Sequence, residues 1–542
     1  MLNLSLRNMS LMEWLAAAFV ISLLVYLANI VYNLFFHPLA NIPGPFLARA
    51  SQIPSWYHAT RGDRHIWLWQ QFQIYGDKIR PEPNAVLFNN PAAYADIYGL
   101  KSNVRRSNFY KDSLFHGPEV TTVSAVDVAE HARKRRLLSL AFTENSVRAA
   151  SSFVIRHLDR WNQLLTEKDG SIWSPAVDIS EKISGLVFDI MGDLSFGKSL
   201  DVKEPGANPL KTVHHKMADY LKLSNSISRS PFRDHIIWLM PRGLGKLFAL
   251  LTPAPIRQYK QFVYDSVTER IALHREQAGK TEVEQRQDMF YFLCEARNPD
   301  TGLPAYKEAE LRAKANLLIV AGSDTASVAL SGMLFYVTGD SWRYQKLVQE
   351  IRTEFETPDD IVYGPKLSSL VYLRACIEEG MRLSPAVPGD LPREVLSGGL
   401  EIQGEYFPPG TIVGITNWAL SRNQEVYGDP ELFRPERWIV DEATGVTEED
   451  VNRARSSSHP FAGGPGRCLG QNFAMMEMMI ILARTLHRFD VRREPGSTLG
   501  SGRPEYGWGA RDSKQFHLTD AYISIRRGPM LQFRKRQQSD YA

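Results

Sequence analysis

Apolar and polar positions follow the period of an α-helix over most of this chain. Apolar residues recur every three or four positions through long segments between about 127 and 380, and again over 471–488. Shorter patterns bounded by proline and glycine lie around 394–417 and 515–535, and they predict strands. We therefore predict a mainly α protein with small β-sheets and no internal repeat.

The region from residue 64 to residue 100 is predicted to mix helices and strands. Two helices flank two short strands that extend around Pro81 and Pro83. The predicted elements are a helix over 64–75, strands over 78–80 and 85–88, and a helix over 91–98. Because the conspicuous motifs run from residue 131 to residue 470 and must converge on one site, we predict a single large domain over 51–542.

A strongly apolar segment precedes that domain. Residues 14–36 are 23 positions without a charge, and a helix of that length is ~34 Å long, enough to cross a hydrocarbon core of ~30 Å. The segment is longer than the apolar part of a cleaved signal peptide, and only one basic residue, Arg7, comes before it. We predict a transmembrane anchor over 14–36, between a short lumenal tail (1–13) and a Pro/Gly hinge (37–50).

The basic residues that flank the anchor favour a cytosolic domain. Arg7 lies on one side, and three arginines follow the anchor on the other: Arg49, Arg61 and Arg64. In this topology the two Asn-x-Ser/Thr sites of the chain, at Asn3 and Asn8, are lumenal. Because so short a tail is a poor substrate for glycosylation, we expect these two sites to stay largely unmodified.

Composition excludes several kinds of protein. The 542 residues carry a net charge of +3 and are 44% apolar, as in a globular protein with a large core. So mild a charge gives no reason to expect nucleic acid as a partner. The three cysteines, Cys294, Cys376 and Cys468, are far apart and lack CxxC spacing. This argues against a disulfide framework or a zinc ribbon and suits a reducing compartment.

The segment 461–470 places a cysteine among glycines just before a predicted helix. A thiolate gains from backbone N–H groups at a helix start, and glycines let the backbone approach a flat group closely. This setting suits Cys468 as a thiolate ligand of haem iron, because such a ligand makes the iron electron-rich. The alternative is a buried free cysteine beside a glycine-rich turn.

The long apolar helix predicted over 311–337 is interrupted at residues 321–325. Gly322 costs about 1 kcal/mol inside a helix, and Asp324 and Thr325 are polar where the stripe should be apolar. One interpretation is a kink caused by the Thr325 hydroxyl, which competes for a backbone carbonyl. The other is an acid–alcohol pair that passes protons at a catalytic site. The pentapeptide alone leaves both open.

Glu379 and Arg382 stand three residues apart, which puts both charges on one helix face. Alone, such a pair is usually solvated and of little consequence. The prolines that follow it and the later segment 433–438 change this interpretation, because Arg437 can complete a buried charged triad with Glu379 and Arg382. We predict a structural role for this triad, which fixes the segment that carries Cys468.

In this order and at these separations, the segments resemble the cytochrome P450 family, which are haem-thiolate monooxygenases, of the membrane-bound eukaryotic type. The resemblance covers nearly the whole chain, from the anchor and the Pro-Gly-Pro hinge to the last strands. Segments 36–45 and 131–136 resemble filamentous-fungal members, many of which act in secondary-metabolite biosynthesis. The resemblance implies the haem-thiolate monooxygenase fold behind one transmembrane helix.

The resemblance implies residues of four kinds: a thiolate ligand of haem iron with an aromatic ring packed against it, an acid–alcohol pair, a charged triad, and groups that reach the haem propionates. They are, in that order, Cys468 and Phe461; Asp324 and Thr325; Glu379, Arg382 and Arg437; and His131, Arg135 and Arg393. His131 stands where the family often has tryptophan, and a surface histidine is the alternative for it.

One position departs from the family's pattern. The family usually has a basic residue two positions before the cysteine, facing a propionate, whereas this chain has Gly466 there and Arg467 next to Cys468. Either Arg467 reaches a propionate from the shifted position, or Arg135 and Arg393 hold the haem. Ligation by Cys468 is unaffected.

The resemblance further implies an enzyme of the endoplasmic reticulum membrane that hydroxylates or otherwise oxidises a lipophilic small molecule with dioxygen. Its cofactor is haem b, and NADPH-derived electrons come from a separate membrane-bound reductase, since the chain has no flavin or nicotinamide motif. One alternative is a reductase-independent isomerase or dehydratase, which the Asp324–Thr325 pair argues against. Another is a membrane haem-binding electron carrier. The sequence does not identify the substrate.

Two surface segments are candidates for contact with partners. Arg133, Lys134 and Arg136 flank Arg135 on one predicted helix, and we expect some of them to dock the acidic reductase; a solvated face is the alternative. Apolar residues over 232–251, interspersed with basic ones, suit an interfacial membrane segment, with buried core as the alternative.

Overall fold

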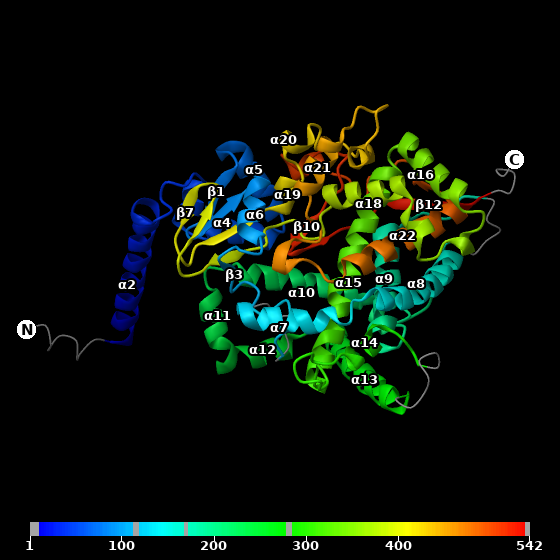
Figure 1. The fold of residues 1–542 in the computed structure, drawn as a ribbon. Helices are drawn as coiled ribbons and strands as arrows, with labels where there is room; N and C mark the ends of the chain where they lie inside the picture. The colour runs from blue at the N-terminus through cyan, green and yellow to red at the C-terminus, as the bar shows by residue number, and fades with distance from the viewer. Residues whose placement is uncertain (1–9, 112–118, 167–171, 278–284, 537–542) are drawn as a thin grey trace, which may run out of the picture.

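The computed structural model describes residues 10–111, 119–166, 172–277 and 285–536. Helices make up most of this part of the chain, which confirms the mainly α prediction. The longer helices of the globular part are α5 (Arg64–Tyr75), α7 (Val128–Ser139), α8 (Glu144–Leu165), α9 (Ile179–Phe196), α10 (Val213–Ser228), α13 (Ala254–Gln277), α15 (Glu308–Val337), α16 (Ser341–Glu354), α18 (Val371–Leu383), α21 (Glu448–Ser457) and α22 (Gln471–Arg488). Figure 1 shows them gathered around α15, which passes through the middle of the molecule.

Shorter elements complete the fold. The short helices used below are α3 (Phe46–Ala50), α4 (Ile53–Arg61), α6 (Ala92–Tyr98), α11 (Arg233–Leu239), α12 (Leu244–Leu251), α14 (Met289–Glu295) and α19 (Asn417–Leu420). The strands are β1 (Lys78–Glu82), β2 (Ala85–Phe88), β3 (Val104–Arg106), β4 (Val177–Asp178), β5 (Arg393–Val395), β6 (Leu400–Ile402), β7 (Glu405–Phe407), β8 (Ile412–Ile415), β9 (Phe489–Arg493), β10 (Thr519–Ala521), β11 (Ile523–Ile525) and β12 (Met530–Lys535).

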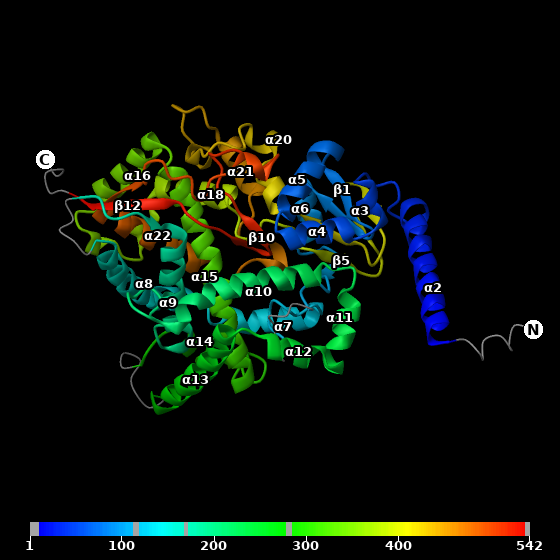
Figure 2. The same cartoon turned by 180° about the vertical axis from the view of Figure 1, so that it is seen from behind.

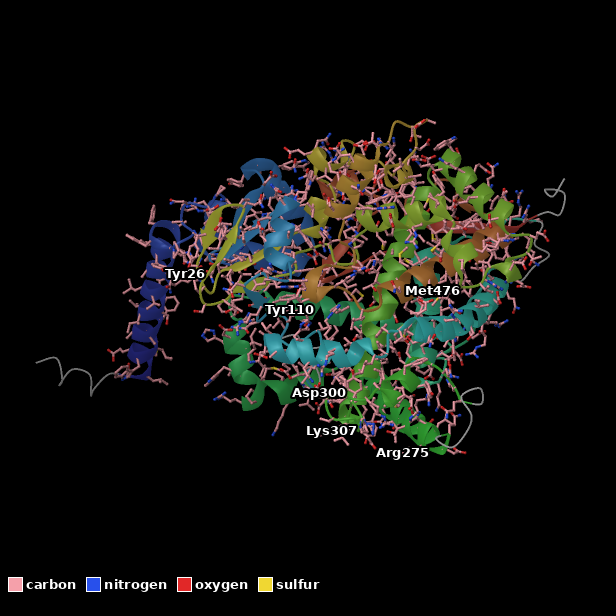
Figure 3. The ribbon with its side chains drawn as sticks, in the orientation of Figure 1. Tyr26, Tyr110, Arg275, Asp300, Lys307 and Met476 are labelled. Atoms are coloured by element: carbon pink, nitrogen blue, oxygen red, sulfur yellow. The ribbon has the colours of Figure 1, made fainter. Side chains whose placement is uncertain are left out.

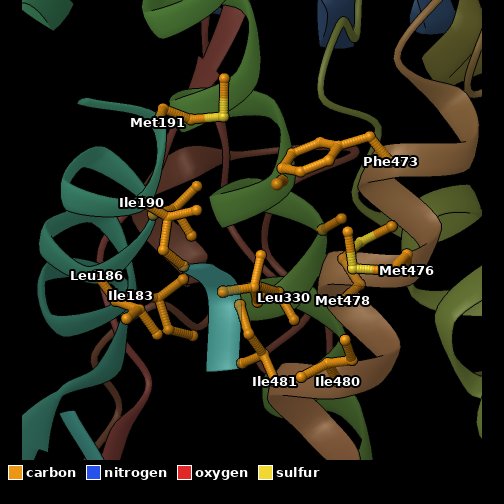
Figure 4. Close-up of a cluster of buried hydrophobic side chains, with 14 of the residues drawn as sticks. Ile183, Leu186, Ile190, Met191, Leu330, Phe473, Met476, Met478, Ile480 and Ile481 are labelled. Carbon is orange, nitrogen blue, oxygen red and sulfur yellow. The ribbon is translucent and has the colours of Figure 1, made fainter. Parts of the chain in front are cut away.

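The main core lies where α9, α15 and α22 meet. Figure 4 shows Ile190 on α9, Leu330 on α15 and Ile481 on α22 among the apolar side chains that fill the space between the three helices. Each fully buried leucine or isoleucine here contributes about 1.5–3 kcal/mol relative to an exposed one. Gly322 marks a close crossing, because a Cβ there would lie 2.7 Å from Cε of Met191 on α9. The packing therefore explains a glycine that is unfavourable for the helix alone.

The largest sheet joins strands from the two ends of the chain. Its order is β1-β2-β8-β5-β3, in which β2 and β8 run parallel and the other neighbours antiparallel. The hinge packs on this sheet instead of forming a free linker: Leu39 and Ile42 are buried in the same cluster as Val86 and Val413. The backbone N–H of Arg80 also donates to the carbonyl of Pro43, at 2.7 Å. The hinge is therefore fixed to the domain, so that the orientation of the domain depends on that of the preceding helix.

That preceding helix is the candidate membrane span. α2 (Leu11–Val31) continues into the π-helical turn η2 (Tyr32–Phe36), and together they form one apolar helix over Leu11–Phe36, in which α2 has no buried residue. It begins three residues earlier than predicted, because Ser10 and Glu13 form a capping box at its start. Figures 1 and 3 show it apart from the globular body, with Tyr26 on its length. Helix α15, which is also long and apolar, is the core helix and not a second span.

The segment that contains α11 and α12 is attached loosely. Neither helix, nor the turn between them, has a buried residue, and Trp238 and Leu250 are 58% and 78% exposed. Figures 1 and 2 show α11 on the same side of the molecule as α2. The alternative of a buried core segment is therefore wrong, and contact with a membrane surface stays a prediction.

Several sequence expectations are matched closely and others are not. Helices α5 and α22 have the predicted bounds, and the strands of both predicted strand regions are present. Strand β9 was not predicted, because Phe489–Arg493 follows α22 without a break in its apolar pattern. Helix α15 is continuous through residues 321–325, where its apolar pattern is interrupted. The glycosylation sites at Asn3 and Asn8 lie outside the described residues.

Candidate active site

A cavity of about 970 Å³ lies inside the helical part of the domain. Residues from α7, α9, α10, α13, α15, α22 and the β10–β11 hairpin line it, and most of these residues are apolar. Cys468 is exposed to the cavity, and Phe461 and Gly470 line the wall beside it. The one cysteine that the sequence singles out therefore lies at an internal space large enough for a cofactor together with a small molecule.

The loop before Cys468 depends on glycine. Gly464 has φ +55°, and a Cβ there would lie 1.9 Å from the carbonyl oxygen of Tyr98. The backbone N–H of Cys468 donates to the carbonyl of Phe461 at 2.8 Å, which closes the loop on itself. Burial raises the pKa of the Cys468 thiol, whereas the N–H of Gly470 and the positive charge of Arg135 lower it. A metal cation bound to the sulfur would displace the thiol proton, because a coordinating thiol is deprotonated.

One end of the cavity is strongly cationic. Arg106, His131, Arg135 and Arg393 all line it, and none of them forms an ion pair with a carboxylate in the part of the chain that the structure describes. Burial and the three arginines lower the pKa of His131 to about 4. Holding these positive charges close together in a buried site costs free energy unless an anion binds beside them. The end therefore fits the two carboxylates of a haem, with the Cys468 sulfur on the same cavity wall.

The structure explains the departure at Gly466. A Cβ at this position would lie 3.0 Å from Nη2 of Arg393, so the guanidinium of Arg393 occupies the space that a basic side chain would need. Arg467 lines the cavity too, but its side chain is exposed and its Nε donates to Oε1 of Gln471 at 2.9 Å. Of the two arrangements that the sequence left open, the geometry favours Arg135 and Arg393.

The alcohol and the acid of α15 face different surroundings. Thr325 lines the cavity, and its hydroxyl donates to the carbonyl of Ala321 at 2.7 Å. Asp324 is not among the lining residues, and its Oδ1 lies 3.6 Å from Nη1 of Arg526. Burial raises the pKa of Asp324, against the charge of Arg526, which lowers it. The hydroxyl therefore faces the cavity, and the carboxyl lies one residue away in a buried ion pair.

The charged triad is assembled as predicted from the sequence. Nε and Nη2 of Arg382 donate to the two oxygens of Glu379, both at 2.8 Å, and Nε of Arg437 donates to Oε1 at 3.0 Å. Trp438 Nε1 also donates to Oε2, at 3.0 Å. Burial raises the pKa of Glu379, but the two guanidinium groups lower it further, to about 2. The carboxylate is fully buried and stays charged because every lone pair it offers has a donor.

The residues around Arg135 on α7 do not form one surface. Lys134 is buried, and its Nζ lies 3.6 Å from Oε1 of Glu310, so it cannot belong to a docking patch. Arg136 is half exposed and pairs with Asp300. Arg133 is exposed. Lys134 is therefore not one of the residues that form the expected patch, which stays a prediction for the two arginines.

A second, smaller cavity opens behind the cysteine loop. Its volume is about 360 Å³, and it shares Phe461 and Arg467 with the first cavity. Arg374 and Arg455 line it as well, with Glu378 as the acidic residue of its lining. Burial raises the pKa of Glu378, against the two arginines. This hollow is a cationic concavity next to the loop that carries Cys468.

Two residues at the main cavity were missed by sequence reasoning. Arg106 ends strand β3 and belongs to no motif, so nothing local pointed to it. Glu477 on α22 is 1% exposed, and neither of its oxygens has a hydrogen-bond partner within the described residues. Burial raises its pKa to about 8, so this carboxyl keeps its proton at neutral pH. A lone acid in the run Met475–Met479 was the available signal.

The chain is similar to known proteins over nearly its whole length. The family model described as Cytochrome P450 matches residues 39–502. A cytochrome P450 monooxygenase named fscF from Fusarium equiseti is 34% identical, with 97% of each chain covered. Another, AKT7 from Alternaria alternata, is 32% identical, with 94% of this chain and 95% of the relative covered. A third, atnE from Emericella nidulans, is 30% identical over 93% and 94% of the two chains.

The site therefore consists of a thiol at a large internal cavity inside a mainly helical fold. The chain belongs to the cytochrome P450 family, and its full-length relatives make it a cytochrome P450 monooxygenase. Membership of that family brings haem, dioxygen and electrons supplied by a reductase.

Proposed function

We propose that this protein oxidises a lipophilic small molecule in fungal secondary metabolism, with haem b held by Cys468 and electrons from NADPH through a separate reductase. The observation that carries the proposal is the cavity itself. It combines an exposed thiol, a cluster of cations that have no carboxylate partner among the described residues, and mostly apolar walls. The fungal relatives support the setting, since the chain matches them over nearly its whole length.

Each part of the cavity has a separate task. Haem, when bound, supplies the chemistry that activates dioxygen and inserts one oxygen atom into substrate. Cys468 would ligate its iron, and Arg106, Arg135 and Arg393 would neutralise its propionates. His131 would reach the same propionates, and its low pKa rises as they bind. The cysteine loop and the cationic end would thereby fix the plane of the cofactor from two sides.

Thr325 is the residue placed to handle protons. Its hydroxyl is the only one on the segment 321–325 that faces the cavity, because Ser323 is not among the lining residues. The hydroxyl holds its proton on the Ala321 carbonyl and can turn that proton towards the cavity. Asp324 and Arg526 would resupply it from the buried side of α15. The apolar walls exclude bulk water, so protons reach the site through such groups.

The surfaces support a membrane-bound enzyme with a separate electron donor. The helix over Leu11–Phe36 suits a single-pass anchor in the endoplasmic reticulum, with the catalytic domain in the cytosol. The exposed apolar residues of α11 and α12 suit contact with the same membrane. The cationic hollow behind the cysteine loop suits docking of an acidic reductase. Arg133, which is exposed and lies two residues before Arg135, suits the same partner.

A reconstitution experiment tests the proposal. The full-length protein, combined with a fungal NADPH–cytochrome reductase, is expected to show the red-shifted ferrous–carbonyl band of sulfur-ligated haem and to consume dioxygen when its substrate is added. Cys468→Ser is expected to lose the band, because the hydroxyl is a poor ligand for the iron. A serine variant that kept the band would sink the assignment of Cys468. A wild-type protein that had the band but needed no reductase for turnover would favour an isomerase or dehydratase instead.

A further inference from the structure

A second buried charge cluster lies away from the cysteine loop, at the end of α10. This roof cluster consists of Arg64, Glu82, Arg229 and Asp390, which come from α5, β1, the residue after α10, and the loop before β5. Their side chains are 2%, 14%, 9% and 2% exposed, respectively. None of the catalytic tasks above uses them. Four distant parts of the chain thus converge on one buried group of charges.

Asp390 is the centre of the roof cluster. Its Oδ1 accepts hydrogen bonds from Nη1 of Arg64 and from Nη2 of Arg229, the latter at 3.0 Å. Glu82 assists from the other side, with Oε1 at 3.3 Å from Nη2 of Arg64 and 3.9 Å from Nη1 of Arg229. Burial raises the pKa of Asp390, but the two guanidinium groups lower it to about 2. Arg229 is therefore held by charge-assisted bonds in a dry setting, where they are strong.

Arg229 also touches the cavity wall. Its guanidinium lies 4.8 Å from the ring centroid of Phe109, which lines the cavity. The helix that Arg229 follows, α10, is itself a large part of the wall, and its lining residues are Met217, Tyr220, Leu221, Ser224, Asn225 and Ser228. One side chain therefore connects the body of the protein, the cavity wall and the end of a wall helix.

The chain changes character directly after this point. Up to residue 228, α10 packs against α4 and β10 and has several buried residues. From Arg233 to Leu251 no residue of α11, the following turn or α12 is buried. A segment without buried contacts opens at low cost, whereas a helix end held in a buried ion cluster does not. Arg229 stands at the boundary between the two.

We propose that Arg229 is a positioning residue that anchors the end of α10, so that this wall helix stays in place while bulky ligands exchange with the cavity. Without the anchor, the end of α10 would move more easily, and the barrier to exchange of large ligands would fall. The inference rests on the proposed haem-binding function, because the ligands that report on it bind the haem iron.

The test compares a bulky and a small iron ligand on the full-length, haem-loaded protein. Stopped-flow absorbance follows binding and release of clotrimazole, which must pass the wall, and of imidazole, which is small enough to pass without its movement. In Arg229→Met we expect clotrimazole to associate and dissociate about tenfold faster, as one lost charge-assisted bond allows, with imidazole rates unchanged. Clotrimazole rates equal to those of the wild type would overturn the proposal, as would equal acceleration of both ligands.

Companion variants separate anchoring from general damage. Arg229→Lys keeps the charge beside Asp390 and is expected to restore most of the slow exchange; exchange as fast as in the methionine variant would contradict an ionic anchor. Arg229→Gln carries the same expectation as Arg229→Met and replaces it if the latter does not retain haem. Lys216→Met is the matched control on α10, because Lys216 is 46% exposed and pairs only with Asp219 among the described residues, at 3.6 Å. Faster clotrimazole exchange in that control would refute a specific role of Arg229.

Failure of the anchor and failure of the proposed function have different signatures. A wild-type protein without the ferrous–carbonyl band, or without a spectral response to imidazole, would contradict haem binding itself. A wild-type protein that shows both, with Arg229 variants that exchange clotrimazole at the wild-type rate, would contradict only the anchor.

Discussion

The charged triad and the roof cluster are both buried, yet they are built differently. In the triad a single carboxylate, Glu379, is shared by Arg382 and Arg437 and receives four side-chain hydrogen bonds. In the roof cluster two carboxylates, Asp390 and Glu82, face two arginines. A third acid, Asp520, lies close by.

Asp520 is an additional buried carboxyl group close to the arginines of the roof cluster. It is 3% exposed, and burial together with the charge of Asp390 raises its pKa, so it is more readily protonated than an ordinary aspartate. Arg64 and Arg229 are near enough to favour its charged form. If Asp390 lost its charge, the repulsion that helps to raise the pKa of Asp520 would disappear, and Asp520 would be the carboxylate left beside Arg64 and Arg229 together with Glu82. In the triad the additional acid is Asp429, whose Oδ1 lies 2.8 Å from Nη2 of Arg437. Arg382 pairs with Glu379 alone among the described residues, so the triad depends on Glu379 at this one arginine.

Neutralising the central acid of each cluster is the strongest test of this comparison. Glu379→Gln leaves the fully buried Arg382 without a counter-charge, whereas Arg437 keeps Asp429, and we expect a loss of about 3–5 kcal/mol in unfolding free energy and little haem-loaded protein. Asp390→Asn is expected to cost only about 1–2 kcal/mol, because Glu82 and Asp520 remain. Thermal unfolding and the yield of the ferrous–carbonyl band measure both. Equal losses of unfolding free energy in the two variants would show that Asp520 does not compensate for the lost charge of Asp390.

A change on α15 separates chemistry from the stability of either cluster. Thr325→Ala removes the hydroxyl that faces the cavity, and we expect product formed per dioxygen consumed to fall by about tenfold while Tm is unchanged. Ser327→Ala is the matched control, since Ser327 makes the same type of bond, to the Ser323 carbonyl at 2.6 Å, but is fully buried and does not line the cavity. Coupling unchanged in Thr325→Ala would contradict the proton-handling role.

Charge reversal compares the exposed face of α7 with the exposed turn between α11 and α12. Arg133→Glu places a like charge opposite an acidic reductase, and we expect reductase-driven turnover to fall by a few fold, about what one interfacial charge contributes, with peroxide-driven turnover intact. Arg242→Glu, on the exposed turn between α11 and α12, is expected to leave both rates unchanged in detergent. Equal loss of reductase-driven and peroxide-driven turnover in Arg133→Glu would show damage to the site and not to docking.

The pH dependence of stability tests the uncharged acid on α22. Because burial raises the pKa of Glu477 to about 8, this group is protonated in the folded protein at pH values where the unfolded chain has lost the proton. Its contribution is full below the ordinary pKa of glutamate and is lost as pH rises towards 8, at ~1.4 kcal/mol per unit. Glu477→Gln should therefore unfold at a higher Tm than the wild type near pH 8, with the difference vanishing near pH 4. A pH-independent difference would contradict a buried neutral carboxyl.

Local sequence patterns determine which elements form and which residue types surround Cys468. The bounds of α5 and α22 follow from apolar periodicity, because amphipathic helices are specified by residues three and four apart. The contact between Glu379 and Arg382 follows from spacing on one helix turn, and the glycines around Cys468 follow from backbone geometry within a few residues. Such features involve short separations along the chain, which a sequence displays directly.

Only the tertiary structure decides which polar groups lose their water and what they then meet. Lys134 and Arg133 are neighbours in sequence, yet one is buried against Glu310 and the other is exposed. Asp324 and Thr325 are adjacent, yet they face different partners because successive helix positions point about 100° apart.

The same holds for the groups assembled from distant segments. Arg64, Arg229 and Asp390 meet although more than a hundred residues separate each from the next, and Arg106 and Glu477 reach the cavity from a strand and a helix without a motif. The sequence by itself determined the helices, the cysteine loop and the charged triad, because short-range periodicity and spacing encode them. The folded arrangement alone decided the cationic end, the roof cluster and the uncharged Glu477, because desolvation and long-range charge depend on packing between elements.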